Sequence, residues 1–431
     1  MRERGLVVVL GTLDTKGDQI KYLKELIERR GHDTCVVDVG VVGPVPFVPA
    51  ISREEVARAA GTTLDNIIAL NAPGSALREM AKGASEIVGG LCAVGRLDGF
   101  VALGGSGGTS LALSVIKGIP IRVPKLIVTT MAYSSAITPD MVSGDNVMML
   151  PWVGGLWGIN SISRGVLEMA AGTICGAIEA YDRTKMRERK VVGVTALGST
   201  VNRYLGDLKA AIEGRGLEMA VFHVTGMSGR MYERAIADGL IDASLDLSVG
   251  VELLNSLTGG VCSAGPDRLE AAGRMAIPQI VSPGATEAFH WGGERPFPSK
   301  YRRRPTHRHN ALILTVASSP KETAAVGRLT AEKLNRAKGP VAVIIPMKGF
   351  GAPPRRISSG PSGTGSAQKV AGFREALTRL TPLCMRAFRK GLMEHINSGI
   401  EVVELDAGFN DPIFLDTVLR LFDGMMSGPT A

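Results

Sequence analysis

The 431-residue sequence contains few cysteines and no long apolar run. Its five cysteines are scattered and form no C-x-x-C pair, which argues against both a disulfide framework and a common type of zinc site. Its apolar runs stay below the roughly eighteen residues that a membrane span needs, and residues 1–5 lead directly into an apolar strand. We therefore expect a cytoplasmic protein without a signal peptide or a membrane span.

Several catalytic signatures are also missing. The chain has neither the G-x-S-x-G elbow of α/β-hydrolases nor the G-K-[ST] ending of a Walker A loop. Its six histidines include His307 and His309, which have the spacing of two metal ligands on a strand but lie in an arginine-rich segment with no third ligand nearby. We expect neither a covalent hydrolase nor a metal site formed by these histidines.

The composition is typical of α/β proteins. Hydrophobic residues make up 45% of the sequence, aromatic residues only 5%, and 54 residues are glycine. Aliphatic strands joined to helices by glycine-rich turns have this composition. The length suits two domains of about 200 residues each. We place their joint in the charged stretch 181–190 and predict two Rossmann-like subdomains with mostly parallel sheets, residues 1–185 and 186–431.

An internal duplication supports this division. At an offset of 185 positions, the strand, turn, helix and strand pattern of residues 6–39 recurs at residues 191–224. A second pair of segments, 99–105 and 259–265, also resemble each other. In each segment the pattern predicts an apolar strand that meets a glycine turn, and an Ile-Pro dipeptide and another strand follow. Repeated βαβ units of this kind require right-handed crossovers and a mostly parallel sheet.

The most informative segment is the glycine run at residues 104–110. It follows an apolar strand and opens a helix, so glycine there lets the backbone N–H groups of the helix N-terminus approach an anion. The run is similar to the GGDGT turn of NAD kinases and diacylglycerol kinases, but lacks its Asp. We predict phosphate binding, and a merely close-packed turn is the alternative. The binding residues predicted here are Gly104, Gly105, Ser106, Gly107, Gly108, Thr109 and Ser110.

Two further turns are candidates, because ligands in open α/β sheets bind beyond the carboxyl ends of the strands. The turn after the first strand offers a carboxylate and an ammonium beside hydroxyl groups, a set that suits Mg²⁺ and a phosphate. A helix N-cap role for Asp14 or Thr15 is the alternative. The other turn follows the strand 125–129. The residues concerned are Gly11, Thr12, Asp14, Lys16, Thr129, Thr130 and Met131.

In the second half, the turn 263–268 ends in Asp267 and Arg268. An Arg there can bind an anion through two N–H groups, so our catalytic candidates are Asp14, Lys16, Asp267 and Arg268. The structural alternative makes Asp267 a first-turn carboxylate favoured by the helix dipole and Arg268 its partner at the surface.

The net charge of +8 is concentrated in one loop and not spread over the chain. The loop carries Arg295, Lys300, Arg302, Arg303, Arg304 and Arg308. Because it has turn chemistry and no helix to fill a groove, we expect a solvated loop or a wall facing a polyanion, and no nucleic-acid binding. A second loop, 348–366, is rich in glycine, proline and serine, which makes it a candidate lid or a disordered insertion.

Taken together, the motifs resemble an uncharacterised protein family that includes the N-terminal ATP-binding domain of the tomato mosaic virus resistance protein. They lie in order along nearly the whole chain, at residues 11–17, 36–40, 104–109, 123–126, 160–164, 263–269 and 281–284. The resemblance implies ATP as the cofactor, two α/β subdomains and a homodimer. It also implies a separate TIM-barrel protein as a partner, since plant and fungal members carry such a domain themselves. Where relatives tend to have His in an Asp-Ala-His-x-Asn-Asp-Pro motif, this chain has Gly408.

Three functions fit these observations. The first is an ATP-binding protein that holds the phosphates against residues 104–110, with Thr12, Asp14 and Lys16 beside them. The second is an Mg²⁺-dependent enzyme of phosphoryl transfer or hydrolysis on a small metabolite, because such chemistry needs positioning and charge neutralisation more than a special nucleophile. The third is a dimeric interaction module that a nucleotide stabilises.

Overall fold

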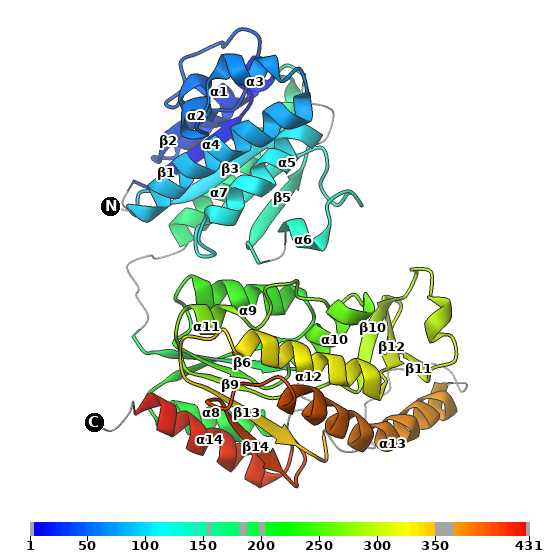
Figure 1. The fold of residues 1–431 in the computed structure, drawn as a ribbon. Helices are drawn as coiled ribbons and strands as arrows, with labels where there is room; N and C mark the ends of the chain where they lie inside the picture. Colours follow the sequence, from blue (N-terminus) through cyan, green and yellow to red (C-terminus); the bar gives the residue numbers. More distant parts are fainter. Residues whose placement is uncertain are drawn as a thin grey trace. The chain divides into compact units, whose positions relative to one another are not determined.

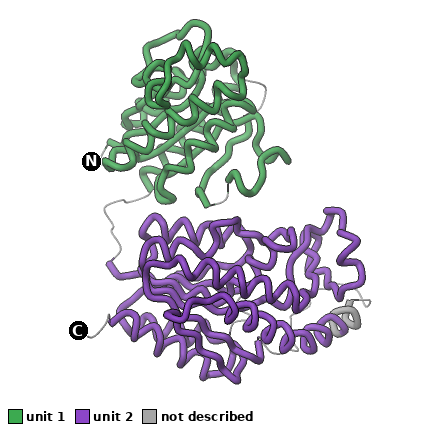
Figure 2. Tube along the Cα trace, in the orientation of Figure 1, with its two compact units in different colours: residues 1–186 green, residues 187–431 purple. Residues whose placement is uncertain are grey.

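The chain divides into two compact units, residues 1–186 and 187–431, shown in green and purple in Figure 2. The computed structural model describes residues 4–142, 144–152, 157–180, 188–197, 203–349 and 366–427, with side chains from residue 372 onward in the last range. In these residues no helix is both long enough and apolar enough to cross a membrane.

Unit 1 is built on a five-stranded parallel sheet of order β2-β1-β3-β4-β5 (Figure 1). Its strands are β1 (Leu6–Gly11), β2 (Asp33–Asp38), β3 (Gly99–Gly104), β4 (Lys125–Thr129) and β5 (Val147–Pro151). Its helices are α1 (Leu13–Arg29), α2 (Arg53–Ala59), α3 (Leu64–Ala69), α4 (Pro73–Ala93), α5 (Ser106–Val115), the 3₁₀ turn η1 (Ile116–Gly118), α6 (Pro139–Val142) and α7 (Ser161–Ala180).

Both faces of this sheet are covered, and the alternation of side chains along β1 shows how. Val7 and Val9 pack with side chains of α1 and α7 on one face. Val8 and Leu10 pack with side chains of α2, α4 and α5 on the other. A strand whose two faces are both buried is apolar at every position, which is why β1 has no polar residue to mark an outer side.

Unit 2 contains a six-stranded parallel sheet of order β14-β13-β9-β8-β6-β7 and a three-stranded antiparallel sheet of order β10-β12-β11. The parallel strands are β6 (Val191–Ala196), β7 (Glu218–His223), β8 (Ala243–Asp246), β9 (Gln279–Val281), β13 (Val341–Pro346) and β14 (Glu401–Leu405). The antiparallel strands are β10 (Ala288–Gly292), β11 (Thr306–Arg308) and β12 (Ile313–Ala317).

The helices of unit 2 lie on both faces of the parallel sheet, with α8 and α14 on one side (Figure 1). They are α8 (Leu205–Gly214), α9 (Met227–Ala237), α10 (Gly250–Thr258), α11 (Ala271–Arg274), the 3₁₀ turn η2 (Ser299–Tyr301), α12 (Pro320–Leu334), α13 (Ser366–Met393) and α14 (Pro412–Met426). Ala342 and Ile344 of β13 face α8 and α14, whereas Val343 and Ile345 pack with side chains of α10, α12 and α13.

The two parallel sheets repeat one topology. Strands β2-β1-β3-β4-β5 of unit 1 and strands β7-β6-β8-β9-β13 of unit 2 run in the same spatial and sequential order, and unit 2 adds β14 beyond β13. The predicted α/β class with two mostly parallel sheets is therefore confirmed. The strands expected after the Ile-Pro dipeptides also form, as β4 and β9.

The prediction of an apolar strand within the segment 259–265 is wrong. Helix α10 ends there, because Gly259 adopts the left-handed conformation (φ 77°) that commonly terminates a helix, and residues 260–262 continue as a turn. The position beside β6 that matches β3 is occupied by β8 instead. The loop predicted at 348–366 lies almost entirely outside the described residues.

Candidate functional site

The carboxyl ends of β1 and β3 mark the point where the strand order of unit 1 reverses. From β1 the chain passes to β2 on one side, and from β3 it passes to β4 on the other. The turns come close together here, since a Cβ added to Gly11 would lie 3.3 Å from the carbonyl oxygen of Leu103. A crevice at such a reversal is the usual place for a ligand in doubly wound sheets.

Helix α5 starts at this point with an uncapped N-terminus. Its N-cap is Gly105, in extended conformation (φ −78°, ψ −158°), with no capping side chain within the described chain and no acidic residue in the first turn. By contrast, α2 and α12 each begin with a capping box. The Thr109 N–H donates to the Gly105 carbonyl at 2.8 Å, so the preceding N–H groups, at 106–108, are those without an intrahelical acceptor. Together with the positive end of the helix dipole they form a site suited to an anion.

The glycines of the run have different roles. A Cβ at Gly104 would lie 2.8 Å from the Cα of Gly108, so Gly104 is required for close packing of strand and helix. A Cβ at Gly105 would meet only the Thr130 hydroxyl, at 3.8 Å, and otherwise enters open space. The sequence allowed two interpretations of this turn, close packing and ligand access. The structure assigns close packing to Gly104, and it leaves space for a ligand over Gly105.

A buried hydroxyl network joins the turns after β3 and β4. The Thr109 hydroxyl donates to the Gly105 carbonyl at 2.7 Å, and it lies 2.5 Å from the Thr129 hydroxyl. Because the Thr109 proton is used on Gly105, Thr129 donates to Thr109, and it also accepts from the Met131 N–H at 2.8 Å. The structure thereby brings four of the predicted binding residues, Gly105, Thr109, Thr129 and Met131, together in a turn held by hydrogen bonds.

A hollow of about 520 Å³ adjoins this turn, between α5, α6 and the segment 131–137; we call it the α5 hollow. One wall carries the hydroxyl groups of Ser106, Ser110 and Ser114, which lie four residues apart on α5. The opposite wall is largely apolar. The complete lining is Ser106, Thr109, Ser110, Leu113, Ser114, Lys117, Met131, Ala136, Ile137, Asp140 and Met141.

A second hollow, of about 670 Å³, lies at the start of α1; we call it the α1 hollow. It is lined by residues 13–19 with Pro44, Pro46, Trp157 and Gly158. Asp14 and Lys16 therefore line a different hollow from Ser106, and the structure does not bring the two predicted sets into one pocket.

Asp14 and Asp38 hold the turn at the start of α1. Asp38 accepts from the backbone N–H groups of Leu13 at 3.0 Å and Gly40 at 2.8 Å, so it satisfies the N-terminus of α1, a role that the sequence suggested for Asp14 or Thr15. Asp14 instead accepts, at 3.2 and 3.3 Å, from the N–H groups of residues 41 and 42, and its other oxygen has no hydrogen bond within the described chain. Burial raises the pKa of Asp38.

Lys16 lies beside Asp14 and is partly desolvated. Burial lowers the pKa of its ammonium group, and the Asp14 carboxylate opposes that shift. Its Nζ donates to the Thr15 carbonyl at 3.0 Å. Among the described residues no group of three or more His, Cys, Asp or Glu side chains is arranged to hold a metal ion.

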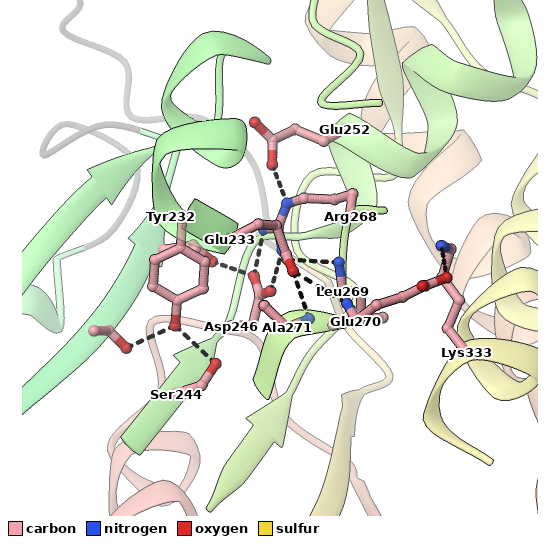
Figure 3. Close-up of polar contacts among 12 residues, drawn as sticks. Tyr232, Glu233, Ser244, Asp246, Glu252, Arg268, Leu269, Glu270, Ala271 and Lys333 are labelled. Atoms are coloured by element: carbon pink, nitrogen blue, oxygen red, sulfur yellow. Dashed lines mark hydrogen bonds and ion pairs between the residues drawn. The ribbon is translucent and has the colours of Figure 1, made fainter. Parts of the chain in front are cut away.

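Arg268 of unit 2 is fully buried, which corrects the expectation that it pairs at the surface (Figure 3). Its Nε donates to Glu252 at 2.6 Å, its Nη1 donates to Glu233 at 3.0 Å and to Asp246 at 2.5 Å, and its Nη2 donates to Asp246 at 2.8 Å. Its neighbour Asp267 is exposed. Three carboxylates thus surround the guanidinium group, which is consistent with a structural ion and not with an anion-binding group.

The same carboxylates organise the surrounding backbone. Glu233 accepts from the N–H groups of Leu269 at 2.6 Å and Ala271 at 2.7 Å, and Glu252 accepts from Gly226 at 2.8 Å. Burial raises the pKa of Glu252, and Arg268 opposes that shift. We call Glu233, Asp246, Glu252 and Arg268 the ionic cluster.

Helix α10, which follows β8 as α5 follows β3, begins against other chain segments. A Cβ at Gly250 would lie 2.4 Å from the Thr286 methyl group and 2.8 Å from the Pro283 carbonyl. The turn after β9 therefore covers the N-terminus of α10, whereas the N-terminus of α5 remains accessible.

Sequence reasoning missed part of both regions. The spacing of Ser106, Ser110 and Ser114, four residues apart, was the sequence signal that Ser114 lies on the same helix face as the other two. Helix α6 has only four residues, too few to show a helical pattern of apolar residues. Asp246 lies between Leu245 and Leu247, but Ser244 and Ser248 give this segment an alternating polar pattern, so the sequence does not distinguish a buried charge there from an exposed one. Nor does the sequence name the partner, which is 22 residues further along the chain.

Comparison with solved structures gives only distant similarity. A UDP-GlcNAc 2-epimerase of Methanocaldococcus jannaschii is 9% identical with a TM-score of 0.20, over 64% of this chain and 83% of that one. MnaA of S. aureus, solved with UDP, is 10% identical with a TM-score of 0.21, over 100% and 98% of the two chains. Similarity at this level supports no inference about function.

Comparison with sequences is decisive about the family. The N-terminal domain model of the uncharacterised protein family UPF0261 matches residues 5–183, and its C-terminal domain model matches residues 189–359. UPF0261 proteins of Brucella melitensis and Clostridium tetani are 39% and 34% identical over 97% of this chain, and the alignments cover 94% and 98% of those proteins. The tomato ToMV resistance protein Tm-1 is 29% identical over 80% of this chain and 48% of its own length. The chain belongs to the UPF0261 family.

Proposed function

We propose that the protein binds a nucleotide, with ATP as the expected ligand, through the N-terminus of α5. The observation that carries this proposal is the uncapped start of α5 at the reversal of strand order, with open space over Gly105. Backbone N–H groups and a helix dipole can bind a phosphate without help from a lysine side chain, and residues 104–110 contain no lysine. The family resemblance described in the sequence analysis implies ATP as the cofactor, and this adds support for ATP over other phosphorylated ligands.

The test is calorimetric titration of the purified protein with ATP, ADP and NAD, with and without Mg²⁺. The diagnostic variant is Gly105→Val, because the extended φ of Gly105 suits a β-branched residue and the added Cβ meets no backbone atom. Gly118→Val is the matched control, since Gly118 is exposed near the other end of the same helical segment and its added Cβ has no neighbour within 4 Å. We expect Gly105→Val to weaken ATP binding by at least about tenfold and Gly118→Val to leave it unchanged. Unchanged affinity in Gly105→Val contradicts the proposed phosphate site.

A second candidate is an Mg²⁺-dependent enzyme of phosphoryl transfer or hydrolysis. The α1 hollow favours it, because Asp14 and Lys16 both line this hollow and one buried carboxylate oxygen of Asp14 has no hydrogen bond in the described chain. If Asp14 serves chemistry, Asp14→Asn stops turnover of bound ATP and spares its binding. A homodimer and a separate TIM-barrel protein as partner complete this proposal, and sedimentation analysis with and without ATP tests the dimer.

A further inference from the structure

We infer that the nucleoside part of the ligand lies along α5 in the α5 hollow, with its sugar against the serine hydroxyls and its base between Leu113, Ile137 and Met141. This inference rests on the proposed function and adds to it the direction in which the ligand runs. Its starting point is Ser106, which belongs to the first turn of α5 and also lines the hollow. A phosphate on the helix start therefore places the rest of the ligand directly at the mouth of the hollow.

The serine wall has the length and chemistry that a nucleoside needs. Ser106 and Ser114 are eight residues apart, which at 1.5 Å per residue is about 12 Å along the helix axis. Each hydroxyl offers one donor and two acceptor positions, and the Ser114 hydroxyl, which donates to the Ser110 carbonyl at 3.1 Å, keeps its acceptor capacity. Sugar hydroxyl groups are suitable partners for such a row.

The opposite wall suits an uncharged, flat group. Met141 is 41% exposed and lines the hollow with Ile137, so apolar surface is available that the core of unit 1 does not bury. Methionine adapts its shape and makes favourable contacts with aromatic faces. A cavity of about 520 Å³ with apolar walls and a few polar groups is also typical of small-molecule sites.

At the far end of the hollow the positive charge of Lys117 is already paired, which suits an uncharged base better than a second anionic group of the ligand. Lys117 lies there, and its ammonium contacts the Asp145 carboxylate at 2.5 Å, which balances its charge. The competing position for a base is the α1 hollow, where the ring of Trp157 is 91% exposed. That hollow adjoins α1, whereas the serine row leads away from the start of α5.

Two binding measurements on the full chain separate these positions. Ser114→Phe fills the far end of the α5 hollow from an exposed helix position, and Thr173→Phe, which puts the same side chain on an exposed position of α7, is the matched control. We expect Ser114→Phe to weaken ATP binding by at least about tenfold and to leave tripolyphosphate binding unchanged, while Gly105→Val weakens both. Thr173→Phe and Trp157→Ala should match the parent protein.

Photolabelling with 8-azido-ATP and peptide mapping locates the base directly and does not depend on a variant that folds. The expected labels lie within residues 106–117 or 131–141. Labelling at Trp157 or in unit 2, or full ATP affinity in Ser114→Phe, overturns the inference. If Gly105→Val loses ATP while Ser114→Phe retains it, only this inference fails; if the parent protein binds no ATP, the proposed function fails with it.

Discussion

The β3–α5 turn of unit 1 and the β8–α10 turn of unit 2 occupy the same place in two sheets of the same strand order, yet their chemistry is opposite. In unit 1 the strand ends in glycines, and the helix begins without a cap or a charge. In unit 2 the strand ends in Asp246, and the space around it is filled by the ionic cluster, while another turn covers the helix start. A duplicated scaffold can thus leave its strand ends accessible to a ligand or use them for internal charge pairing, and a few residues decide which.

Removing the cation of the ionic cluster should have the largest effect. In Arg268→Met the carboxylates of Glu233, Asp246 and Glu252 remain buried without a counter-charge, so we expect unit 2 to lose about 3–5 kcal/mol of unfolding free energy. Urea unfolding followed by hydrogen exchange in peptides of unit 2 measures this loss, because Trp152 and Trp157 of unit 1 also contribute to the intrinsic fluorescence. The ATP binding proposed for unit 1 should be unaffected.

The control for this prediction is Arg274→Met. Arg274 pairs with Glu270 in an exposed i,i+4 arrangement on α11, and such pairs contribute at most about 1 kcal/mol. If Arg268→Met also loses less than about 1 kcal/mol of unfolding free energy, the ionic cluster does not stabilise unit 2 as we expect.

Acid should destabilise unit 2 through His290. Burial lowers the pKa of His290 from 6.5 to about 4, so between these values the unfolded chain binds a proton that the folded protein does not. Stability therefore falls as the pH falls through this window, by about 3 kcal/mol for a shift of this size.

The slope of unfolding free energy against pH, in the parent and in His290→Gln, measures this contribution. The raised pKa of Glu252 acts in the opposite direction and is present in both proteins, so the difference between the slopes isolates His290. Equal slopes would contradict the prediction.

Alanine at neighbouring glycines should separate packing from ligand access in unit 1. Gly104→Ala places a methyl group 2.8 Å from the Gly108 backbone, and we expect it to cost about 1–3 kcal/mol of stability, as overpacking usually does. Gly105→Ala meets no such contact and should leave the thermal unfolding midpoint close to that of the parent protein. Equal losses in the two variants would indicate that the whole run serves packing.

The hydroxyl network should have the smallest effect. In Thr109→Val, Thr129 loses the acceptor for its proton and the Gly105 carbonyl loses a donor, so we expect a loss of about 1 kcal/mol in unit 1. Urea unfolding measures it, and Thr173→Val on the exposed face of α7 is the control. An effect as large as that of Arg268→Met would mean that the turn of unit 1 depends on buried polar groups as much as unit 2 does.

The predictable parts of the fold are those that local pattern determines. The apolar run of β1 and the strands after the Ile-Pro dipeptides carry their own signals, and all of them form. Strand β8 was not predicted, because it has four residues, two of them polar, and Asp246 can be buried only with a cation that the chain supplies later. The apolar stretch at 259–262 gave a false strand because Gly259 ends a helix there, a conformation that composition does not reveal.

The candidate site also has parts that the local sequence predicts and parts that only tertiary packing determines. The glycine run and the turn 129–131 follow predicted strands, and the parallel sheet brings them together. The α5 hollow depends on where α6 and the segment 131–137 lie, and these have no regular sequence period. The separation of Ser106 from Asp14 and Lys16 into two hollows is likewise a property of tertiary packing.

Arg268 also sets the earliest point at which β8 can be buried as the chain is synthesised. Glu233, Asp246 and Glu252 leave the ribosome before it, and until it emerges these carboxylates keep their water and β8 cannot be buried at low cost. Strand β3, with no charged residue, has no such requirement, so unit 1 can close as soon as α7 has been made. The two halves of the duplication therefore share a topology, and only the second needs a cation from a later segment before its third strand can be buried.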